Sequence, residues 1–273
     1  MAAATHPAPT ADGPAVDSVR SRGPAAFGAV TPRRAVASGA DVVRVFHEDP
    51  ELLAGLDPAA TDLLRRRVVV PKLCVDAGPW SAPMEEASPG SLGLLVLDGL
   101  MIRSLSLAGR KCPELIGAGD VLRPWDGEEE DGSVTMSVSW TVLERTTFAV
   151  LDERFAPVLC RFPTIVPALL SRTVQRSQTL AFLLGIAHIR HAETRLHTLL
   201  WHLADRWGRV TPAGVHLPLA LTHETLAQLV CMRRPTASTT LQRLARAGEV
   251  ERRRDGTWLL TGQPPSFHDA QAA

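Results

Sequence analysis

Residues 222–250, THETLAQLVCMRRPTASTTLQRLARAGEV, predict two short helices joined by a tight turn. Thr222 supplies an N-cap hydroxyl for the first helix, and Glu224 puts a negative charge into its first turn, where the helix dipole stabilises it. The apolar side of this helix is formed by Leu226, Ala227 and Val230. Residues 231–233 then form the turn, so the stretch is typical of a helix-turn-helix.

The second helix is predicted from about Pro235 to Ala247. Pro235 suits the first turn because an N–H there has no helical partner, and Gly248 serves as the C-terminal cap. At roughly 100° per residue, one face is apolar and consists of Ala237, Leu241 and Leu244. The opposite face carries small polar and Arg side chains that suit hydrogen bonding to base edges in a DNA groove: Thr239, Gln242 and Arg246, flanked by Ser238 and Arg243.

Residues 248–262, GEVERRRDGTWLLTG, predict a β-hairpin after the second helix. Asp255-Gly256 is a strong turn signal between two short β-like runs. A helix-turn-helix followed by a hairpin is a winged helix, and Arg252, Arg253 and Arg254 place positive charge on its wing, near DNA phosphates. The alternative is a three-helix packing unit whose Arg residues only keep it soluble. Agreement of the turn, the polar face and the basic wing favours DNA binding.

Residues 221–262 resemble the winged helix of the CRP/FNR (catabolite activator type) transcription regulators, and the resemblance extends back over the preceding helices. Arg234 matches the family's Arg that reads a guanine, whereas Pro235 and Thr239 stand where the family has Glu and a second base-reading Arg. We therefore expect an operator unlike the family's usual sequence. The DNA-binding residues expected here are Arg233, Arg234, Thr236, Ser238, Thr239, Gln242, Arg243, Arg252, Arg253 and Arg254.

Charge is unevenly spread along the chain, although the 273 residues have a formal net charge of zero. Residues 222–262 contain seven Arg and four acidic residues, a net +3, while residues 76–160 contain fourteen acids and six bases, a net −8. An acidic front part and a basic back part fit a regulator that touches nucleic acid only through its C-terminal part.

Other functional classes find little support in the sequence. No two of the four cysteines (Cys74, Cys112, Cys160, Cys231) are close in sequence, which excludes a local zinc or iron–sulfur ligand set and suggests a reducing cytoplasm. The alternative to four unlinked thiols is a redox switch between distant cysteines. Four histidines on predicted helices are candidates for packing groups or for metal or haem ligands: His188, His191, His197 and His202. With no membrane-spanning run, signal-peptide core, nucleophile elbow or phosphate loop, we expect a soluble cytoplasmic protein that is not an enzyme.

The first half of the chain predicts a tail, two helices and a β domain. Residues 1–40, rich in Ala, Pro, Gly and Thr, are expected to be disordered, as are residues 263–273. Two short amphipathic helices follow, the second from Pro58 to Arg67. Short apolar runs then predict an antiparallel barrel or jelly roll. They are separated by turn signals at Asp98-Gly99, Ala108-Gly109 and Gly117 to Asp120, and two further runs follow in residues 134–144 and 146–152.

The resemblance implies that this β-roll is a cyclic-nucleotide-binding domain whose ligand site has changed. Gly119-Asp120 falls at the family's Gly-Asp turn, after which ligand-binding relatives carry Gly-Glu-Leu and later Arg with Ser or Thr to hold the cyclic phosphate and ribose. This chain has Arg123-Pro124-Trp125 instead, and residues 128–131 add four negative charges that we interpret as a solvated loop. We therefore expect no cyclic-nucleotide cofactor.

A long helix is predicted over residues 163–190, opened by Pro163 and carrying a broad apolar stripe. Taken alone, it is also compatible with an ordinary core helix. The resemblance makes it a dimerisation helix, with a homodimer interface at Leu169, Val174, Leu180, Leu184 and Ala187. The polar pair that contacts the adenine base in cyclic-AMP-binding members falls at Leu180 and Ala181, neither of which can hydrogen-bond a base.

The expected protein is α+β: an N-terminal double-stranded β-helix (jelly-roll) domain at 41–162, a dimerisation helix at 163–190 and a winged helix-turn-helix at 191–262. Residues 194–208 form the helix leading into the winged domain, and Val215 to Leu221 a short strand. The expected function is a homodimeric, sequence-specific DNA-binding transcription regulator, with double-stranded DNA, a second copy and RNA polymerase as partners. The alternative is a receptor for a cyclic nucleotide or another small molecule that controls DNA binding.

Overall fold

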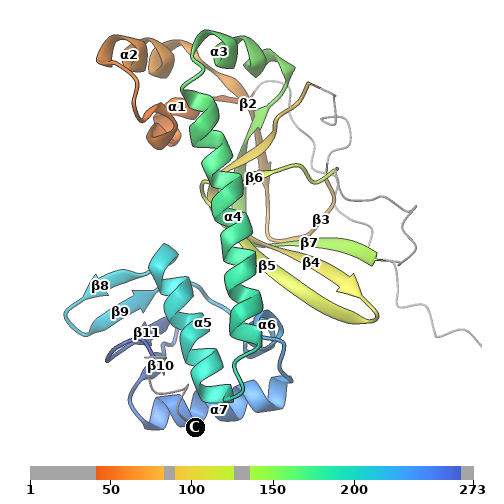
Figure 1. The fold of residues 1–273 in the computed structure, drawn as a ribbon, viewed down its shortest axis with the longest axis vertical. Coiled ribbons are helices and arrows are strands. Elements are labelled where there is room, and N and C mark those ends of the chain that lie inside the picture. Colours follow the sequence, from red (N-terminus) through yellow and green to blue (C-terminus); the bar gives the residue numbers. More distant parts are fainter. Residues whose placement is uncertain (1–40, 83–89, 126–135, 266–273) are drawn as a thin grey trace, which may run out of the picture. The chain divides into compact units, whose positions relative to one another are not determined.

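The structure, a computed structural model, describes residues 41–82, 90–125 and 136–265 (Figure 1). It begins with strand β1 (Val42–Val43), helix α1 (Val45–Glu48), a 3-10 turn (Pro50–Leu53) and helix α2 (Pro58–Arg67). Helix α2 has the predicted bounds, and the Asp57 carboxylate caps it by accepting from the N–H groups of Ala59 and Ala60 at 3.0 and 2.9 Å. The other predicted helix is divided into α1 and the 3-10 turn, because Pro50 disfavours helical backbone at Asp49.

An antiparallel sheet follows, which confirms the predicted β-roll. Its strands are β2 (Val70–Val75), β3 (Gly78–Trp80), β4 (Gly93–Leu107), β5 (Arg110–Gly117), β6 (Val121–Leu122) and β7 (Met136–Leu151). The order along the main path is β1-β2-β7-β4-β5, with β3 paired to β7 and β6 paired to β4. The interior is filled by large apolar side chains, among them Leu73, Leu94, Met101, Ile116 and Phe148.

One predicted turn and one predicted division between strands are wrong in this domain. Asp98-Gly99 does not join two strands but interrupts the register between β4 and β7 inside one continuous strand. Gly99 has φ +101, and a Cβ there would lie 2.6 Å from the Arg145 carbonyl oxygen, so β7 passes too close for any other residue. The two runs predicted in residues 134–144 and 146–152 likewise belong to the single strand β7, beginning at Met136. The turns at Ala108-Gly109 and at residues 117–120 do connect successive strands.

Three helices connect the β-roll to the C-terminal part: α3 (Ala156–Arg161), α4 (Ile165–Ala187) and α5 (Ala192–Trp207). The short α3, preceded by a 3-10 turn (Glu153–Phe155), was not expected from the sequence. Helix α4 lies within the range predicted for the long helix and starts two residues after Pro163. Figure 1 shows α5 beside the C-terminal half of α4. No helix among the described residues is both long and apolar enough to cross a membrane.

The C-terminal part is a winged helix, as predicted, with one additional strand. It contains β8 (Arg209–Thr211), β9 (Gly214–Leu217), α6 (His223–Leu229), α7 (Arg234–Arg246), β10 (Val250–Arg252) and β11 (Trp258–Leu260), with sheet order β10-β11-β9-β8. The predicted strand from Val215 to Leu221 ends at Leu217, because Pro218 cannot donate a ladder hydrogen bond. The hairpin partner β8 was missed. The core of this part includes Leu199, Leu217, Leu226 and Trp258, and Leu115 of β5 packs against it.

Candidate DNA interface

Helices α6 and α7 form the predicted helix-turn-helix with its predicted N-cap. The Thr222 hydroxyl accepts a hydrogen bond from the Thr225 N–H at 3.1 Å, so Thr222 satisfies a donor that the helix itself leaves free. The turn has a left-handed residue, Cys231, with φ +54. The next amide, that of Met232, donates back to the Ala227 carbonyl at 2.9 Å and so fixes the angle at which α7 leaves α6.

Helix α7 buries the predicted face and one further residue. Ala237, Leu241 and Leu244 are all buried in the winged-helix core, and Thr240 is buried with them. The helix ends as predicted at Gly248, whose φ of +74 lets the following amide, that of Glu249, donate to the Leu244 carbonyl at 3.0 Å.

The outer face of α7 remains open to solvent over its full length. Six predicted DNA-binding residues are exposed here, counting the N-cap residue Arg233: Arg233, Arg234, Thr236, Thr239, Gln242 and Arg243. Two of them already have partners: the Thr239 hydroxyl donates to the Pro235 carbonyl at 3.1 Å, and the Arg243 guanidinium pairs with Glu193 at 3.0 Å. Both partners of the latter pair are about half exposed, so the pair can open at little cost when another anion approaches.

The wing is a hairpin of β10 and β11 whose tip carries exposed cations. Arg252, Arg253 and Arg254 are all exposed, and the Arg252 guanidinium lies 5.5 Å from the centroid of the Trp258 ring. The turn is held by Asp255, which accepts from the Thr257 hydroxyl at 2.6 Å and from its N–H at 3.0 Å. These two hydrogen bonds lower the pKa of the Asp255 carboxyl, which stays ionised and orders the wing tip.

Ser238 differs from the other predicted DNA-binding residues because it is half-buried. Its hydroxyl lies 3.0 Å from Nδ1 of His223, the first residue of α6. Sequence reasoning passed over His223, although its place directly after the N-cap Thr222 was a signal that it borders the same face. Ser238 therefore ties the two helices of the motif together as well as lying beside the exposed face.

Helix α4 presents an apolar stripe to solvent. Exposed residues repeat at alternating spacings of four and three: Val166, Leu170, Thr173, Ser177, Leu180 and Leu184. Among the predicted interface residues, Leu180, Leu184 and the flanking Val174 are exposed, with 41%, 62% and 46% of their surface accessible. Ala187 is half-buried, and Leu169 packs into the β-roll core next to Ile165. The structure thus places Leu169 on the inner side of α4.

A cavity of about 320 Å³ lies between the β-roll and α4, where the ligand site was expected to be altered. Arg123 lines it and donates to the Ser91 carbonyl, with its guanidinium 5.8 Å from the Trp125 ring centroid. Arg103 and Arg176 also line it, and both contact the buried Glu114 carboxylate, Arg176 through two hydrogen bonds of 2.5 and 2.8 Å. That pairing raises the pKa of Arg176. The acidic residues 128–131 lie outside the described residues, so their predicted solvated loop stays a prediction.

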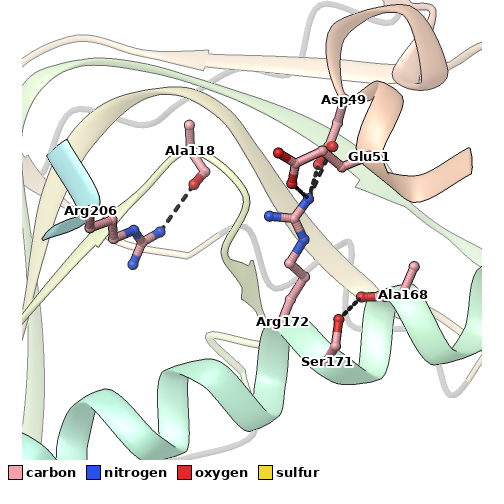
Figure 2. Close-up of polar contacts among 7 residues, drawn as sticks. All are labelled: Asp49, Glu51, Ala118, Ala168, Ser171, Arg172 and Arg206. Atoms are coloured by element: carbon pink, nitrogen blue, oxygen red, sulfur yellow. Dashed lines mark hydrogen bonds and ion pairs between the residues drawn. The ribbon is translucent and has the colours of Figure 1, made fainter. Parts of the chain in front are cut away.

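A second cavity, of about 460 Å³, lies where the turn at residues 118–120 meets α4 and α5. Figure 2 shows two of the Arg residues that line it already engaged: Arg172 with Asp49 and Glu51, and Arg206 with the Ala118 carbonyl at 3.0 Å. Arg206 also donates to Asp120 at 2.9 Å. Burial raises the pKa of the Asp49 carboxyl, and Arg172 acts against that rise. These guanidinium groups hold the turn and the first helices against α4 and α5.

The four cysteines and the four helical histidines do not form a metal site within the described residues. All four cysteines are free thiols, and no two of them form a disulfide. His197 accepts a hydrogen bond from the Trp201 indole N–H at 2.8 Å, and the His202 ring lies 4.4 Å from that of Phe182. Burial lowers the pKa of both imidazoles, which fits packing roles for these two histidines.

Comparison with known proteins agrees with this geometry. Residues 194–261 match the Crp-like helix-turn-helix domain, while a comparison with curated proteins found no match. A cyclic nucleotide-binding domain containing protein from Listeria monocytogenes aligns with TM-score 0.55 and 18% identity, over 70% of this chain and 88% of that one. The c-di-GMP responsive global regulator CLP of Xanthomonas campestris gives 0.52 and 18%, over 71% and 95%. CooA from Carboxydothermus hydrogenoformans gives 0.53 and 20%, over 71% and 84%.

Proposed function

We propose that this chain, which has the fold of the CRP/FNR transcription regulators and their Crp-like helix-turn-helix, is a homodimeric, sequence-specific DNA-binding transcription regulator of the cytoplasm without enzymatic activity. The observation that carries the proposal is the outer face of α7, which is exposed along its length and lies beside a wing with three exposed Arg residues. Double-stranded DNA and a second copy of the chain are the proposed partners, and RNA polymerase is a further one.

The division of labour between α7 and the wing follows from their chemistry. Arg234, in the first turn of α7, offers the planar fork that matches the O6 and N7 acceptors of guanine in the major groove. The wing Arg residues lie at the end of β10 and in the turn that follows it, outside the helix proposed to enter the groove, so they suit phosphates. Helix α7 therefore supplies sequence preference and the wing supplies salt-dependent affinity.

Dimerisation is supported by the α4 stripe, which spaces residues by alternating fours and threes as in a coiled-coil seam. Three of its six positions are Leu and one is Val, and all six are exposed in the single chain. Two copies joined along α4 would present two α7 helices to DNA, and such pairs read half-sites about one helical turn, roughly 34 Å, apart. We infer that the operator is a palindrome with that spacing.

The test is selection of bound fragments from random double-stranded DNA by the purified chain, with and without cell extract. A palindromic consensus with half-sites about one turn apart is the expected result. Recovery of fragments without any shared sequence would refute sequence-specific binding, and a single unrepeated half-site would refute the dimer. A consensus that emerges only in the presence of extract would point to an effector.

A small-molecule receptor that controls DNA binding is the second candidate, and the β-roll cavity is the observation that favours it. The cavity is bordered by Arg103, Arg123 and Arg176. The buried Glu114 carboxylate contacts two of them, Arg103 and Arg176. We propose that a cyclic nucleotide is not the ligand, because Pro124 removes an amide donor and Leu180 and Ala181 cannot hydrogen-bond a base. Calorimetric titration with cyclic AMP and cyclic GMP tests this, and micromolar binding of either would overturn it.

A further inference from the structure

His223 lies where α6, α7 and the wing meet. Its Nδ1 is 3.0 Å from the Ser238 hydroxyl of α7, and its ring centroid is 6.0 Å from that of Trp258 on β11. The guanidinium of Arg252 lies over the same Trp258 ring. The imidazole is thus held from two sides by elements of the proposed DNA-binding face, yet it is only half-buried.

The charged groups around this imidazole are mostly cations. Burial holds the pKa of His223 below its usual value, and Arg252 of the wing and Arg234 of α7 lower it further by repelling a proton on the ring. The neighbouring acid on its own helix, Glu224, accepts from the Gln228 amide at 2.8 Å. Among the described residues, none forms a hydrogen bond with Nε2 of His223. In the free protein these groups therefore favour the uncharged ring, with one nitrogen available.

We propose that His223 is a proton-linked phosphate contact: it takes up a proton from solvent when a DNA phosphate docks beside Arg234 and Arg252, and donates a hydrogen bond from Nε2 to that phosphate. The inference rests on the proposed DNA binding. A phosphate that docks beside these guanidinium groups offsets their repulsion and adds a negative charge beside the ring, so it stabilises the imidazolium. Nδ1–H can then donate to the Ser238 hydroxyl, and both ring nitrogens are donors, as the charged form requires.

The sign of the pH effect follows from the two states of the protein. The pKa of His223 is lower in the free protein and higher in the complex, so DNA affinity is greatest below the free-state pKa, where both states are protonated. Affinity falls as pH rises through the bound-state pKa. Between the two values, the association constant changes by up to about tenfold per pH unit for each protomer, and up to about a hundredfold for a dimer with two such contacts.

The experiment measures binding of the full chain to a fluorescently labelled duplex of random sequence by anisotropy, from about pH 5 to 8, at constant ionic strength. A phosphate contact is sequence-independent, so no operator is needed. The wild type should bind more tightly as pH falls. His223→Asn, which cannot be protonated, should bind with the high-pH affinity of the wild type throughout. His223→Arg, which is always charged, should keep the low-pH affinity throughout.

A matched control is available in the sheet of the winged helix: His216 of β9, whose Nε2 lies 3.1 Å from the Thr257 hydroxyl. His216→Asn should retain the pH dependence. At low pH, the salt dependence of log K should be steeper for the wild type than for His223→Asn by about 0.9 per protomer, which a purely structural role for His223 would not produce.

Three results would overturn the inference: DNA binding by the wild type that does not change with pH, a pH dependence that persists in His223→Asn, or one that disappears in His216→Asn. In each of these cases DNA binding itself stands. Absence of binding to any duplex at every pH would instead overturn the proposed function, and the inference with it. Circular dichroism of the folded variants separates either outcome from a failure to fold.

Discussion

Replacing Leu184 by Glu should dissociate the proposed homodimer without unfolding the protomer. Leu184 is 62% exposed in the single chain, on the stripe of α4 that we assign to the dimer seam. Full burial of a Leu side chain contributes about 1.5–3 kcal/mol. Burial of the 62% that is exposed, once in each protomer, therefore contributes about 2–4 kcal/mol to dimer formation.

That free energy corresponds to a dimer dissociation constant raised by about 30-fold to 800-fold in Leu184→Glu. Two carboxylates facing each other across a two-fold axis would add repulsion, so the lower figure is a minimum. Because Leu184 is exposed within the chain, the variant should keep the helical content and the core of the wild type. DNA affinity should fall along with dimerisation, since one protomer can contact only one half-site.

Sedimentation equilibrium over a range of concentrations measures the effect. The matched control is Gln178→Glu, which adds the same charge at an exposed position of α4 away from the stripe and should remain dimeric. If Leu184→Glu is as dimeric as the wild type, the chains do not associate along this stripe. If Gln178→Glu dissociates equally, charge rather than lost burial accounts for the result.

Three further substitutions test the winged helix. Arg234→Ala should lower operator affinity by about 1–3 kcal/mol and relax the preference at one base position. Arg253→Ala should instead weaken binding to all sequences and flatten the salt dependence of binding. Anisotropy titrations at several salt concentrations separate the two effects, and an unchanged operator affinity for Arg234→Ala would refute the groove assignment. Leu241→Ala, which empties a fully packed position on the inner face of α7, should lower the free energy of unfolding by about 2–5 kcal/mol in a denaturant titration; a loss near zero would mean that this face is not buried. Cys231→Gly should raise stability by about 1 kcal/mol, because Cys231 has φ +54 and glycine adopts that conformation without steric cost; a fall in the melting temperature would contradict the turn geometry.

The helix-turn-helix could be predicted because its signals are local. The Thr222 hydroxyl caps α6 from three residues away, Pro235 lies in the first turn of α7, and Gly248 ends it, so each signal acts within one helical turn. The wing is similar, since the Asp255-Gly256 turn determines its own hairpin. Local rules therefore sufficed for the fold class and for the exposed face of α7.

Local rules failed where a distant strand determines the outcome. Asp98-Gly99 has the composition of a hairpin turn, but β4 continues through it, because β7 pairs on both sides and Gly99 lets its backbone pass at close range. On α4, Leu169 and Leu170 are adjacent apolar residues, and only packing of the β-roll decides that Leu169 is covered while Leu170 stays exposed. The sequence showed a broad stripe, and the structure divided it into an inner and an outer side.

By itself, the sequence determined the two helices and the hairpin of the winged helix, their cap and turn residues, and the replacement of the expected ligand-site residues by Arg123-Pro124-Trp125 and by Leu180-Ala181. Only the tertiary structure decided that Ser238 is turned toward His223, and that His223 lies near two Arg residues from different elements. The physical reason is distance along the chain. Caps and turns depend on neighbours a few residues away, whereas the charge around His223 comes from residues 11 and 29 positions further on, which only folding brings together.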